Sequence, residues 1–414
     1  MLKQISSCRI CGNPNLVTIL SLGEQFLTGV FPKSRDEKIS AGPLELMKCH
    51  GDGVCGLVQL RHSFDSSEMY GENYGYRSGL NSSMVRHLKS KAEMLQRINP
   101  LAEDDLVLDI GSNDGTSLSF YPSKVKRVGM DPTIAKFRRF YQPGIEPIAD
   151  FFTAANFENH FPGRKAKIVS SIAMFYDLDE PLRFVGDVAS VLAPDGIWHF
   201  EQSYMPLMLE HNAYDTICHE HLEYYGLQQI QWMMERCGLR IMDVEMNDIN
   251  GGSFAVTVCL EDAPHKSNTE SIQRLLADEL NAGLQTLQPY ERFRDRVFAH
   301  RDALVVKLRE LSAGGSSILG YGASTKGNVI LQFCGLTERE IPAIAEVNAD
   351  KFGAFTPGTL IPIISEADAH ARKPDYFLVM PWHFRTNLIE REGEFLKHGG
   401  KMIFPLPHIE VVEG

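Results

Sequence analysis

Three adjacent residues in the middle of the chain, His219, Glu220 and His221, combine two imidazoles with a carboxylate in the stretch YDTICHEHLEYY. A neutral imidazole beside a carboxylate can serve as a general base, for example toward a carbon next to a carbonyl group. The residues alone leave two other interpretations open. One is a surface loop whose polar groups are all satisfied, and the other is a metal site of the His-x-His type.

A glycine-containing turn, D-I-G-S-N-D-G at residues 109–115, directly follows the apolar run LVLDI. Such a turn lets the backbone approach a ligand closely. About twenty positions on, Asp131 ends a second apolar run, where it can accept hydrogen bonds from ribose hydroxyls. This spacing also fits a nicotinamide dinucleotide, but the turn lacks the G-x-G-x-x-G pattern that brings a helix N-terminus to a pyrophosphate.

Asn113 and Asp114 add polarity suited to a zwitterionic amino-acid tail, which S-adenosylmethionine has. Met174, Phe175 and Tyr176 follow a later apolar run and are placed to line the adenine or the sulfonium. The sequence therefore predicts an S-adenosylmethionine site, with a plain strand-turn-helix joint as the alternative. The expected cofactor-binding residues are Asp109, Gly111, Asn113, Asp114, Gly115, Asp131, Met174 and Phe175.

Four of the eight cysteines lie in the first 55 residues: Cys8 and Cys11 form C-x-x-C, and Cys49 and Cys55 form a looser pair. Two such pairs in a reducing compartment are typical of a tetrahedral zinc site. Four thiolates would close the coordination sphere, so we expect a structural Zn²⁺. The alternatives are a redox dithiol, unrelated buried cysteines, and replacement of one thiolate by His50.

A second glycine-rich turn, SSILGYGASTKGN, carries Ser324 and Lys326 at the start of an expected helix. It offers backbone N–H groups, hydroxyls and an ammonium to an anion. A nicotinamide dinucleotide is the rival ligand. Against it, the third glycine is misplaced, and the next strand is expected to end in Asn348 instead of an acid. Trp382, His383 and Arg385 follow another expected strand and could join this site, although packing or solvation would also explain them.

The elements that must position these residues alternate between short apolar runs and longer amphipathic segments, which predicts an α/β fold with parallel sheets and crossover helices. We expect three parts. Residues 1–68 form a small zinc-binding lobe, residues 69–262 form the central α/β core, and residues 263–414 form a helical spacer followed by a second, Rossmann-like α/β domain.

Composition restricts the possible partners. The formal net charge of −12 disfavours nucleic acid, whose binding depends on Lys and Arg neutralising phosphates. No segment reaches the roughly 18 apolar residues of a membrane helix, and the N-terminus lacks a signal-peptide run. We therefore expect a cytoplasmic protein, acting as a monomer, with neither nucleic acid nor a membrane as partner.

Several motifs occur together in one order along the chain: the four-cysteine segment with CGLVQL, YRSG at residues 76–79, DIGSNDG, TICHEH, NDINGGSF and YGASTKG. In this order they resemble the sugar C-methyltransferase family, whose members methylate nucleotide-linked 4-keto-6-deoxyhexoses with S-adenosylmethionine. The resemblance covers nearly the whole chain. It implies a class I methyltransferase core between a zinc-binding lobe and a Rossmann-like C-terminal domain, and a role in the biosynthesis of deoxysugars.

The resemblance also implies a mechanism. A base removes the proton at C3 of the keto sugar, and the enolate attacks the sulfonium methyl. Carried onto this chain, His221 is the base, with His219 in the same catalytic set, Glu220 is its orienting or sugar-binding neighbour, and Tyr76 is a donor to the enolate oxygen. The expected substrate-binding residues are Tyr76, Arg77, Ser78, Tyr321, Ser324 and Lys326.

One position departs from the family pattern. Members acting on 4-keto sugars often carry Tyr immediately before His-Glu-His, where this chain has Cys218. The exact sugar is therefore open, and an O- or N-methyltransferase acting on a related nucleotide sugar is the alternative. A reductase based on the C-terminal turn and a non-enzymatic binding module are further alternatives.

Overall fold

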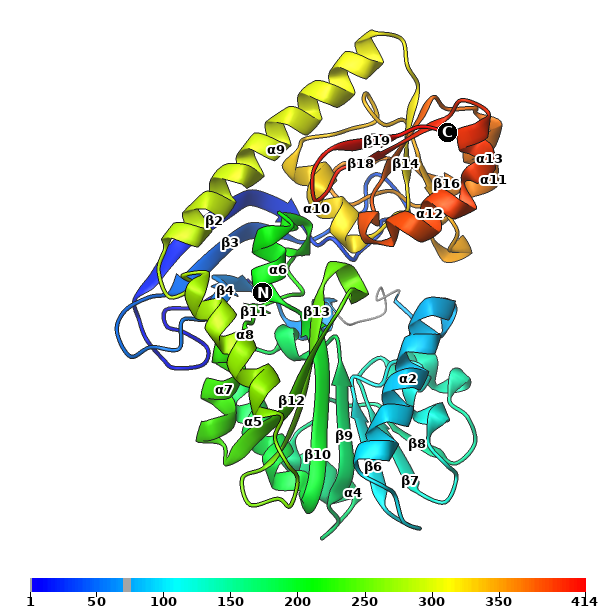
Figure 1. The fold of residues 1–414 in the computed structure, drawn as a ribbon. Helices are drawn as coiled ribbons and strands as arrows, with labels where there is room; N and C mark the ends of the chain where they lie inside the picture. Colours follow the sequence, from blue (N-terminus) through cyan, green and yellow to red (C-terminus); the bar gives the residue numbers. More distant parts are fainter. Residues whose placement is uncertain (1, 70–75) are drawn as a thin grey trace.

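The computed structural model describes residues 2–69 and 76–414 and has three lobes, each built on its own sheet (Figure 1). In Figure 1 the central lobe lies at the bottom, the C-terminal lobe at the top, and the N-terminal lobe beside the junction between them. This arrangement confirms the expected α/β class with three parts.

The N-terminal lobe contains a four-stranded antiparallel sheet of order β11-β4-β3-β2. Its first three strands along the chain are β2 (Leu16–Phe26), β3 (Ala41–Cys49) and β4 (Val58–Leu60). The fourth, β11 (Glu223–Tyr224), comes from the middle of the chain, directly after the His-Glu-His stretch. A short pair, β1 (Lys3–Gln4) with β5 (His62–Ser63), and the helix α1 (Ser66–Met69) complete the lobe.

The central lobe has a seven-stranded sheet of order β12-β13-β10-β9-β6-β7-β8, parallel except around β13. All five residues of β6 are buried, as a strand covered on both faces requires. The sheet confirms the expected class I methyltransferase core. Its strands are β6 (Leu106–Ile110), β7 (Lys126–Met130), β8 (Ile145–Ile148), β9 (Ala166–Ile172), β10 (Leu192–Ser203), β12 (Leu239–Asn247) and β13 (Ser253–Leu260).

Helices cover both faces of this sheet (Figure 1). The longest of them, α2 (Ser82–Ile98), begins at Asn81, whose side chain accepts hydrogen bonds from the backbone N–H groups of Ser83 and Met84 and so caps the first turn. The others are α3 (Ile134–Phe137), α4 (Ala154–His160), α5 (Pro181–Val191), α7 (Leu227–Arg236) and α8 (Thr269–Asn281). The helix α6 (Met205–Glu210) lies at the junction of the lobes, and its buried residues belong to the core of the terminal lobes.

The long helix α9 (Gln288–Ala313) runs from the N-terminal lobe to the C-terminal lobe (Figure 1). It and α8 are the two polar helices that the sequence predicts as a spacer. One face of α9 buries Phe293, Val297, Leu304 and Leu308 at helical spacing. These residues join apolar side chains of β2 to β4 and of the C-terminal sheet in one continuous core, so the two terminal lobes pack as a unit.

The C-terminal lobe has a six-stranded sheet of order β16-β15-β14-β17-β18-β19, parallel except for β19, as expected for a Rossmann-like domain. Its strands are β14 (Ile318–Tyr321), β15 (Ile344–Glu346), β16 (Ile363–Ser365), β17 (Tyr376–Val379), β18 (Lys401–Phe404) and β19 (Glu410–Val412). Its helices are α10 (Thr325–Phe333), α11 (Glu366–Ala371), α12 (Arg385–Arg391) and α13 (Gly393–Lys397).

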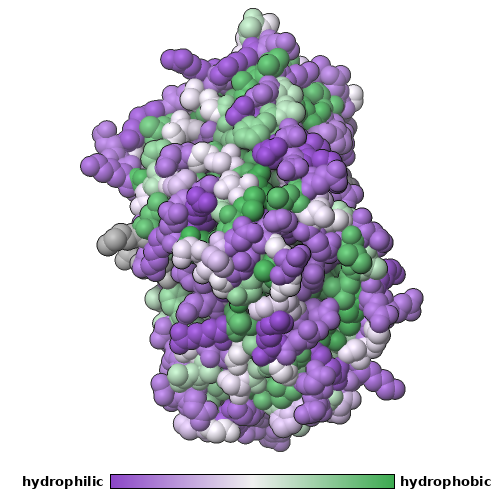
Figure 2. Space-filling model, turned by 90° about the vertical axis from the view of Figure 1, so that its left-hand side faces the viewer, coloured by the Kyte–Doolittle hydropathy of each residue, from purple (hydrophilic) through white to green (hydrophobic). Residues whose placement is uncertain are grey.

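The surface is largely polar. Figure 2 shows one face on which hydrophilic residues predominate and apolar residues are scattered among them. Among the helices in the described part of the chain, none combines the length and the apolar character needed to cross a membrane.

Candidate active site

A cavity of about 1290 Å³ lies where the three lobes meet. Small-molecule sites usually enclose about 300–1,000 Å³, so this cavity has room for two ligands side by side. The N-terminal lobe contributes Gly29 and Phe31, the central lobe contributes the carboxyl ends of its parallel strands, and the C-terminal lobe contributes the turn after β14. Ligands in open α/β sheets bind at such strand ends.

The turn after β6 is held in shape by Asp131 at the end of β7. One oxygen of the Asp131 carboxylate accepts the backbone N–H of Asn113 at 2.8 Å, and the other accepts the N–H and the hydroxyl of Thr133 at 2.6 Å each. Gly111 has φ +73°, and a Cβ on it would lie 2.9 Å from Cγ of Met174. Gly111, Asp131 and Met174 all line the cavity, as expected for cofactor-binding residues.

Asp109 also lines the cavity, at the base of the same turn. Its side chain accepts a hydrogen bond from the Ser170 hydroxyl at 2.5 Å. Burial raises the pKa of the Asp109 carboxyl to about 7. At neutral pH the Asp109 carboxyl is therefore protonated in part of the molecules. It can donate a hydrogen bond when protonated and accept one when ionised, so it can bind a ligand group that is an acceptor or a donor.

Asn113 and Asp114 are engaged differently from what the sequence suggests. The Asn113 amide accepts the N–H of Ser78 at 3.0 Å and donates to the carbonyl of Tyr76 at 3.1 Å. The Asp114 carboxylate accepts the N–H of Gly79 at 2.9 Å and lies 3.5 Å from Nε of Arg77. Both side chains thus bind the segment 76–79 to the turn at residues 109–115, which we call the donor turn. The sequence analysis expected these two side chains to contact the amino-acid tail of a ligand and did not predict their contacts with the segment 76–79.

Three expected cofactor residues do not line the cavity: Asp114, whose carboxylate is engaged with the segment 76–79, Gly115 and Phe175. Phe175 is fully buried in an aromatic cluster, where it stacks on Tyr225 with ring centroids 5.4 Å apart. Gly115 faces the ring of Tyr141, which a Cβ would approach to 2.8 Å. The expectation that Phe175 lines the adenine or the sulfonium is wrong because its side chain is buried in the core, whereas Tyr176, expected in the same role, does line the cavity.

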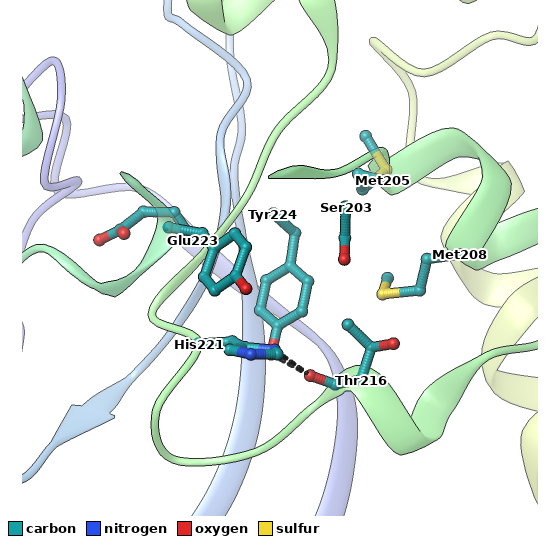
Figure 3. Close-up of a pocket in the computed structure, with 8 residues that line it drawn as sticks. Ser203, Met205, Met208, Thr216, His221, Glu223 and Tyr224 are labelled. Carbon is teal, nitrogen blue, oxygen red and sulfur yellow. Dashed lines mark hydrogen bonds between the residues drawn. The ribbon is translucent and has the colours of Figure 1, made fainter. Parts of the chain in front are cut away.

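His221 lies between the donor turn and the C-terminal lobe, partly exposed to the cavity. Its Nδ1 is 2.8 Å from the carbonyl oxygen of Thr216. A carbonyl oxygen can only accept, so Nδ1 carries the proton and Nε2 keeps its lone pair. Figure 3 shows this contact together with Tyr224 and Ser203, which line a small cavity beside the imidazole. Its volume is about 10 Å³.

The environment of His221 keeps it neutral. Burial and the positive charge of Lys326 lower its pKa to about 4, so the ring is unprotonated at neutral pH. Tyr176 packs edge-on against it, with ring centroids 4.4 Å apart. A neutral imidazole with one lone pair facing a cavity is the form that a general base requires.

Glu220 also lines the cavity but does not orient His221, whose Nδ1 is held by Thr216 instead. The Glu220 carboxylate accepts the hydroxyl of Thr28 at 3.3 Å. A Cβ on Gly29 would come within 2.6 Å of this carboxylate, so only glycine leaves room for it. Burial raises the pKa of Glu220. The N-terminal lobe therefore reaches the site through this contact.

His219, expected in the catalytic set, faces away from the cavity. It is fully buried, its Nε2 lies 3.1 Å from the carbonyl oxygen of Gly42, and it packs edge-on against Phe64 at 5.0 Å. The two histidines thus serve different lobes, which contradicts a joint role in catalysis and a His-x-His metal site. Two residues separated by one position in an irregular loop need not point to the same side.

Cys218 is buried too, with a pKa raised by burial and by the charge of Glu220. It does not line the cavity. Cys218, the position that departs from the family pattern, is therefore part of the buried packing of this loop. The ring of Tyr176 packs against the imidazole of His221.

The turn after β14 is largely occupied by the lobe's own contacts. The Tyr321 hydroxyl donates to Glu392 at 2.6 Å, and the Ser324 hydroxyl caps α10 by accepting the N–H of Gly327 at 3.0 Å. Lys326 lines the cavity, and its ammonium donates to the carbonyl of Asn250 at 2.8 Å. Of the three expected substrate residues here, Lys326 presents a charged group to the cavity.

The second strand of this lobe ends in an acid, contrary to the expectation of Asn348. β15 closes with Glu346, whose carboxylate accepts the N–H groups of Ala323 and Asn348 at 3.0 and 2.9 Å. The Glu346 carboxylate accepts the N–H of Ala323, which is then not available to a ligand, and it places a negative charge beside the turn. A diphosphate is therefore disfavoured at this turn.

Trp382 and Asp215 connect the C-terminal lobe to the loop that carries His221. The indole N–H of Trp382 donates to the fully buried Asp215 carboxylate at 2.7 Å. His383 is largely buried nearby, with a pKa lowered to about 3 by burial and Lys326. Arg385 instead pairs with Glu410 on the surface, so it does not join the site.

The four N-terminal cysteines converge on one point, with all sulfur atoms within 4.8 Å of one another. Sulfur atoms are 3.4 Å apart in the pair Cys8 and Cys55, and 3.5 Å apart in the pair Cys11 and Cys49. A tetrahedral zinc with Zn–S bonds of about 2.3 Å separates its sulfur ligands by roughly 3.8 Å. The donor set fits Zn²⁺, and His50 is not part of the cluster.

Several residues of the site escaped the sequence analysis: Thr28, Gly29, Asp215, Thr216 and Glu346. Each acts through tertiary contacts between lobes or through a backbone atom. Thr216 contributes only its carbonyl, which every residue type has. For Glu346 a signal existed, because the sequence IPAIAEVN shows an acid directly at the end of an apolar run.

Comparison with known proteins gives three matching family models. Residues 8–70 match a zinc binding domain, residues 84–244 a methyltransferase domain, and residues 248–407 a C-methyltransferase C-terminal domain. Across its whole length the chain is 31% identical to the C-methyltransferase NovU of Streptomyces niveus, over 419 residues that cover 98% of that protein.

Solved structures show weaker likeness. An O-methyltransferase family protein from Burkholderia thailandensis is 17% identical, with 49% of this chain and 63% of that chain covered and a TM-score of 0.36. An S-adenosylmethionine-dependent methyltransferase from Clostridium acetobutylicum is 16% identical, with 42% and 92% covered and a TM-score of 0.33. The family assignment rests on the domain models and the full-length relative.

Proposed function

Since the chain belongs to the sugar C-methyltransferase family and is an S-adenosylmethionine-dependent, zinc-binding enzyme, we propose that it methylates carbon 3 of a nucleotide-linked 4-keto-6-deoxyhexose, with His221 as the base. The observation that carries this proposal is the state of His221: its Nδ1 is bound to Thr216, its pKa is lowered to about 4, and its remaining lone pair is available to the cavity. The lowered pKa keeps the imidazole unprotonated and ready to accept a proton, but it also makes the imidazole a weaker base, so removal of a proton beside a ketone requires that the developing enolate is stabilised as well.

In this mechanism Nε2 of His221 takes the proton from C3, and the electron pair of the broken C–H bond moves into the C3–C4 bond while the ketone oxygen becomes an enolate oxygen. Gly111, Asp131 and Met174, which line the cavity, would hold S-adenosylmethionine, and this donor would supply the methyl group for the enolate carbon and leave as S-adenosylhomocysteine. The proton on His221 then leaves to solvent.

The rest of the cavity supports the same assignment. Its volume of about 1290 Å³ holds a methyl donor and a nucleotide sugar together. Asn113 and Asp114 bind the segment 76–79 to the donor turn, and Tyr76, Arg77 and Ser78 of this segment line the cavity. Tyr76 thus remains a residue at the acceptor side, about half of it exposed. Alignment of the two reactants is itself worth a large share of the rate.

The test uses purified holoprotein with S-adenosylmethionine and a panel of 4-keto-6-deoxyhexoses linked to thymidine, uridine, cytidine or guanosine diphosphate. We expect a mass gain of one methylene unit with one of them. Without S-adenosylmethionine in D₂O, the same sugar should exchange its C3 proton. Methylation without such exchange would favour the O- or N-methyltransferase alternative, and no methylation of any sugar would refute the proposal.

A further inference from the structure

Lys326 is a partly buried cation that lines the cavity. Its contacts within the C-terminal lobe do not explain its role. It sits in the first turn of α10, and its ammonium donates to the carbonyl of Asn250 at 2.8 Å. An ammonium has three protons to donate. Among the described residues, no carboxylate lies within 4.0 Å of it, whereas Lys351 in the same cavity has Glu346 at 3.8 Å.

Lys326 lies close to the base. Both residues line the same cavity. The positive charge of Lys326 contributes to the lowered pKa values of His221 and His383, and it counteracts the rise that burial causes in the pKa of Asp215. The Asp215 carboxylate itself is engaged with Trp382. In the described part of the chain, no carboxylate therefore forms an ion pair with the Lys326 ammonium. Burying such a charge costs free energy, and a hydrogen bond to an oxygen of a ligand would offset this cost.

The loop that carries the base also fixes Lys326 relative to it. Thr216 holds Nδ1 of His221, and the adjacent Asp215 holds Trp382 of the C-terminal lobe. The turn Tyr214–Thr216 thus contacts His221 through Thr216, and through Asp215 it contacts the C-terminal lobe that carries Lys326. Asn250, from the turn between β12 and β13, holds the ammonium itself.

We infer that Lys326 is the electrophilic group of the reaction, donating a hydrogen bond to the ketone oxygen that becomes negatively charged when His221 removes the neighbouring proton. This inference rests on the proposed function. The C3–H bond breaks, its proton goes to Nε2, and the charge that develops on the ketone oxygen is met by the ammonium, which keeps its own protons throughout. An electrostatic donor placed in advance is worth about 10²–10³ in rate.

A contact with the diphosphate is the competing role for this lysine. The turn beside it already holds the Glu346 carboxylate, which accepts the N–H of Ala323 and repels an anion. The ammonium instead donates to the carbonyl of Asn250, in the wall of the cavity that His221 also lines. The sugar ring, not the diphosphate, is the part of the substrate that must lie beside the base.

The experiment measures C3 exchange in D₂O without S-adenosylmethionine, using the sugar that the wild-type enzyme methylates. For Lys326→Met we expect exchange at saturating sugar to fall by about 10²–10³-fold, with unchanged affinity for the matching nucleoside diphosphate. Lys326→Arg should recover part of the rate. Exchange at the wild-type rate would overturn the inference, as would a loss confined to nucleoside diphosphate affinity.

A second readout needs no substrate. The pKa of His221 is followed by NMR on histidine-labelled protein, with His221→Asn to identify the signal. We expect Lys326→Met to raise it from about 4 toward the ordinary value of about 6.5. Lys351→Met is the matched control, because Lys351 donates to Ala323 and does not act on His221. An unchanged pKa in Lys326→Met would contradict the proximity on which the inference depends.

Other ionisable groups around His221 remain in place in this variant. They come from its own loop, from the turn after β9 and from β11: Cys218, Glu220, Tyr176, Asp177, Glu223 and Tyr224. None of them contributes to the shift of His221 as Lys326 does. If the wild-type enzyme exchanged no sugar of the panel, the proposed function itself would fall, whereas a normal wild-type rate with an unimpaired Lys326→Met variant removes only the role of Lys326.

Discussion

Nδ1 of His221 lies 2.8 Å from the carbonyl oxygen of Thr216, and this contact determines which nitrogen of the imidazole can act as a base (Figure 3). Because the carbonyl fixes the proton on Nδ1, a substrate proton can only go to Nε2. The carboxylate of the neighbouring Glu220, which the sequence places beside the imidazole, is bound to Thr28 and has a different task.

Replacing His221 with Asn should reduce methyl transfer and C3 exchange by about 10²–10⁴-fold, since a positioned base contributes that much. Asn is close in size and can still donate to Thr216, so the loop should stay in place. Calorimetry should show wild-type affinity for S-adenosylmethionine. Turnover within a few-fold of wild type would remove His221 from the role of base.

Replacing Asp131 with Ala should weaken S-adenosylmethionine binding by about 10–100-fold, because a hydrogen bond to a charged group contributes about 1.5–3 kcal/mol. The same change releases the N–H of Asn113 from its 2.8 Å contact. Calorimetry measures the affinity. Asp104→Ala, which removes an exposed carboxylate of the same lobe, is the control, and equal affinities in the two variants would contradict the assignment.

Replacing Gly79 with Ala should impair the alignment of donor and acceptor, because the new Cβ would come within 2.6 Å of the Asp114 carboxylate that holds this segment. A misplacement of about 1 Å can cost about 10²-fold in rate. We expect a loss of that order in methyl transfer with an unchanged melting temperature. Gly186→Ala, where a Cβ meets nothing within 4 Å, should leave the rate at the wild-type level.

Replacing Cys49 with Ser should abolish stoichiometric zinc and lower the melting temperature, since the metal joins the ends of β3 to the N-terminal segment. Metal analysis should find one zinc per wild-type chain. Cys237→Ser, whose sulfur is outside the cluster, should keep both the zinc and the stability. Full zinc content in Cys49→Ser would refute the four-cysteine site.

The buried histidines should make stability fall as the pH is lowered from about 6.5 toward 4. Burial lowers the pKa of His219 and His221 to about 4 and that of His199 to about 3, below the ordinary value of about 6.5 in the unfolded chain. The unfolded state then binds more protons at these histidines, so acid favours unfolding. Asp109, whose pKa burial raises to about 7, acts in the opposite direction, so the effect is measured by comparing the pH dependence of the melting temperature in the wild type and in His199→Gln. The same pH dependence in both would contradict it.

The sequence by itself determined the kinds of elements and the donor side of the site. Apolar runs such as LVLDI predicted buried parallel strands, and the turn at 109–115 with Asp131 predicted where a ligand meets their ends, because these are properties of local pattern and spacing. The four cysteines predicted a metal site for the same reason: coordination chemistry restricts which residue types can converge.

Only the tertiary structure decided which side chains face the cavity. Phe175 and Tyr176 are adjacent, yet one is buried in an aromatic cluster and the other faces His221. His219 and His221 are separated by one residue, yet they serve different lobes. These outcomes depend on backbone turns in irregular loops and on packing between lobes distant in sequence, such as Trp382 against Asp215, and neither is encoded in local periodicity.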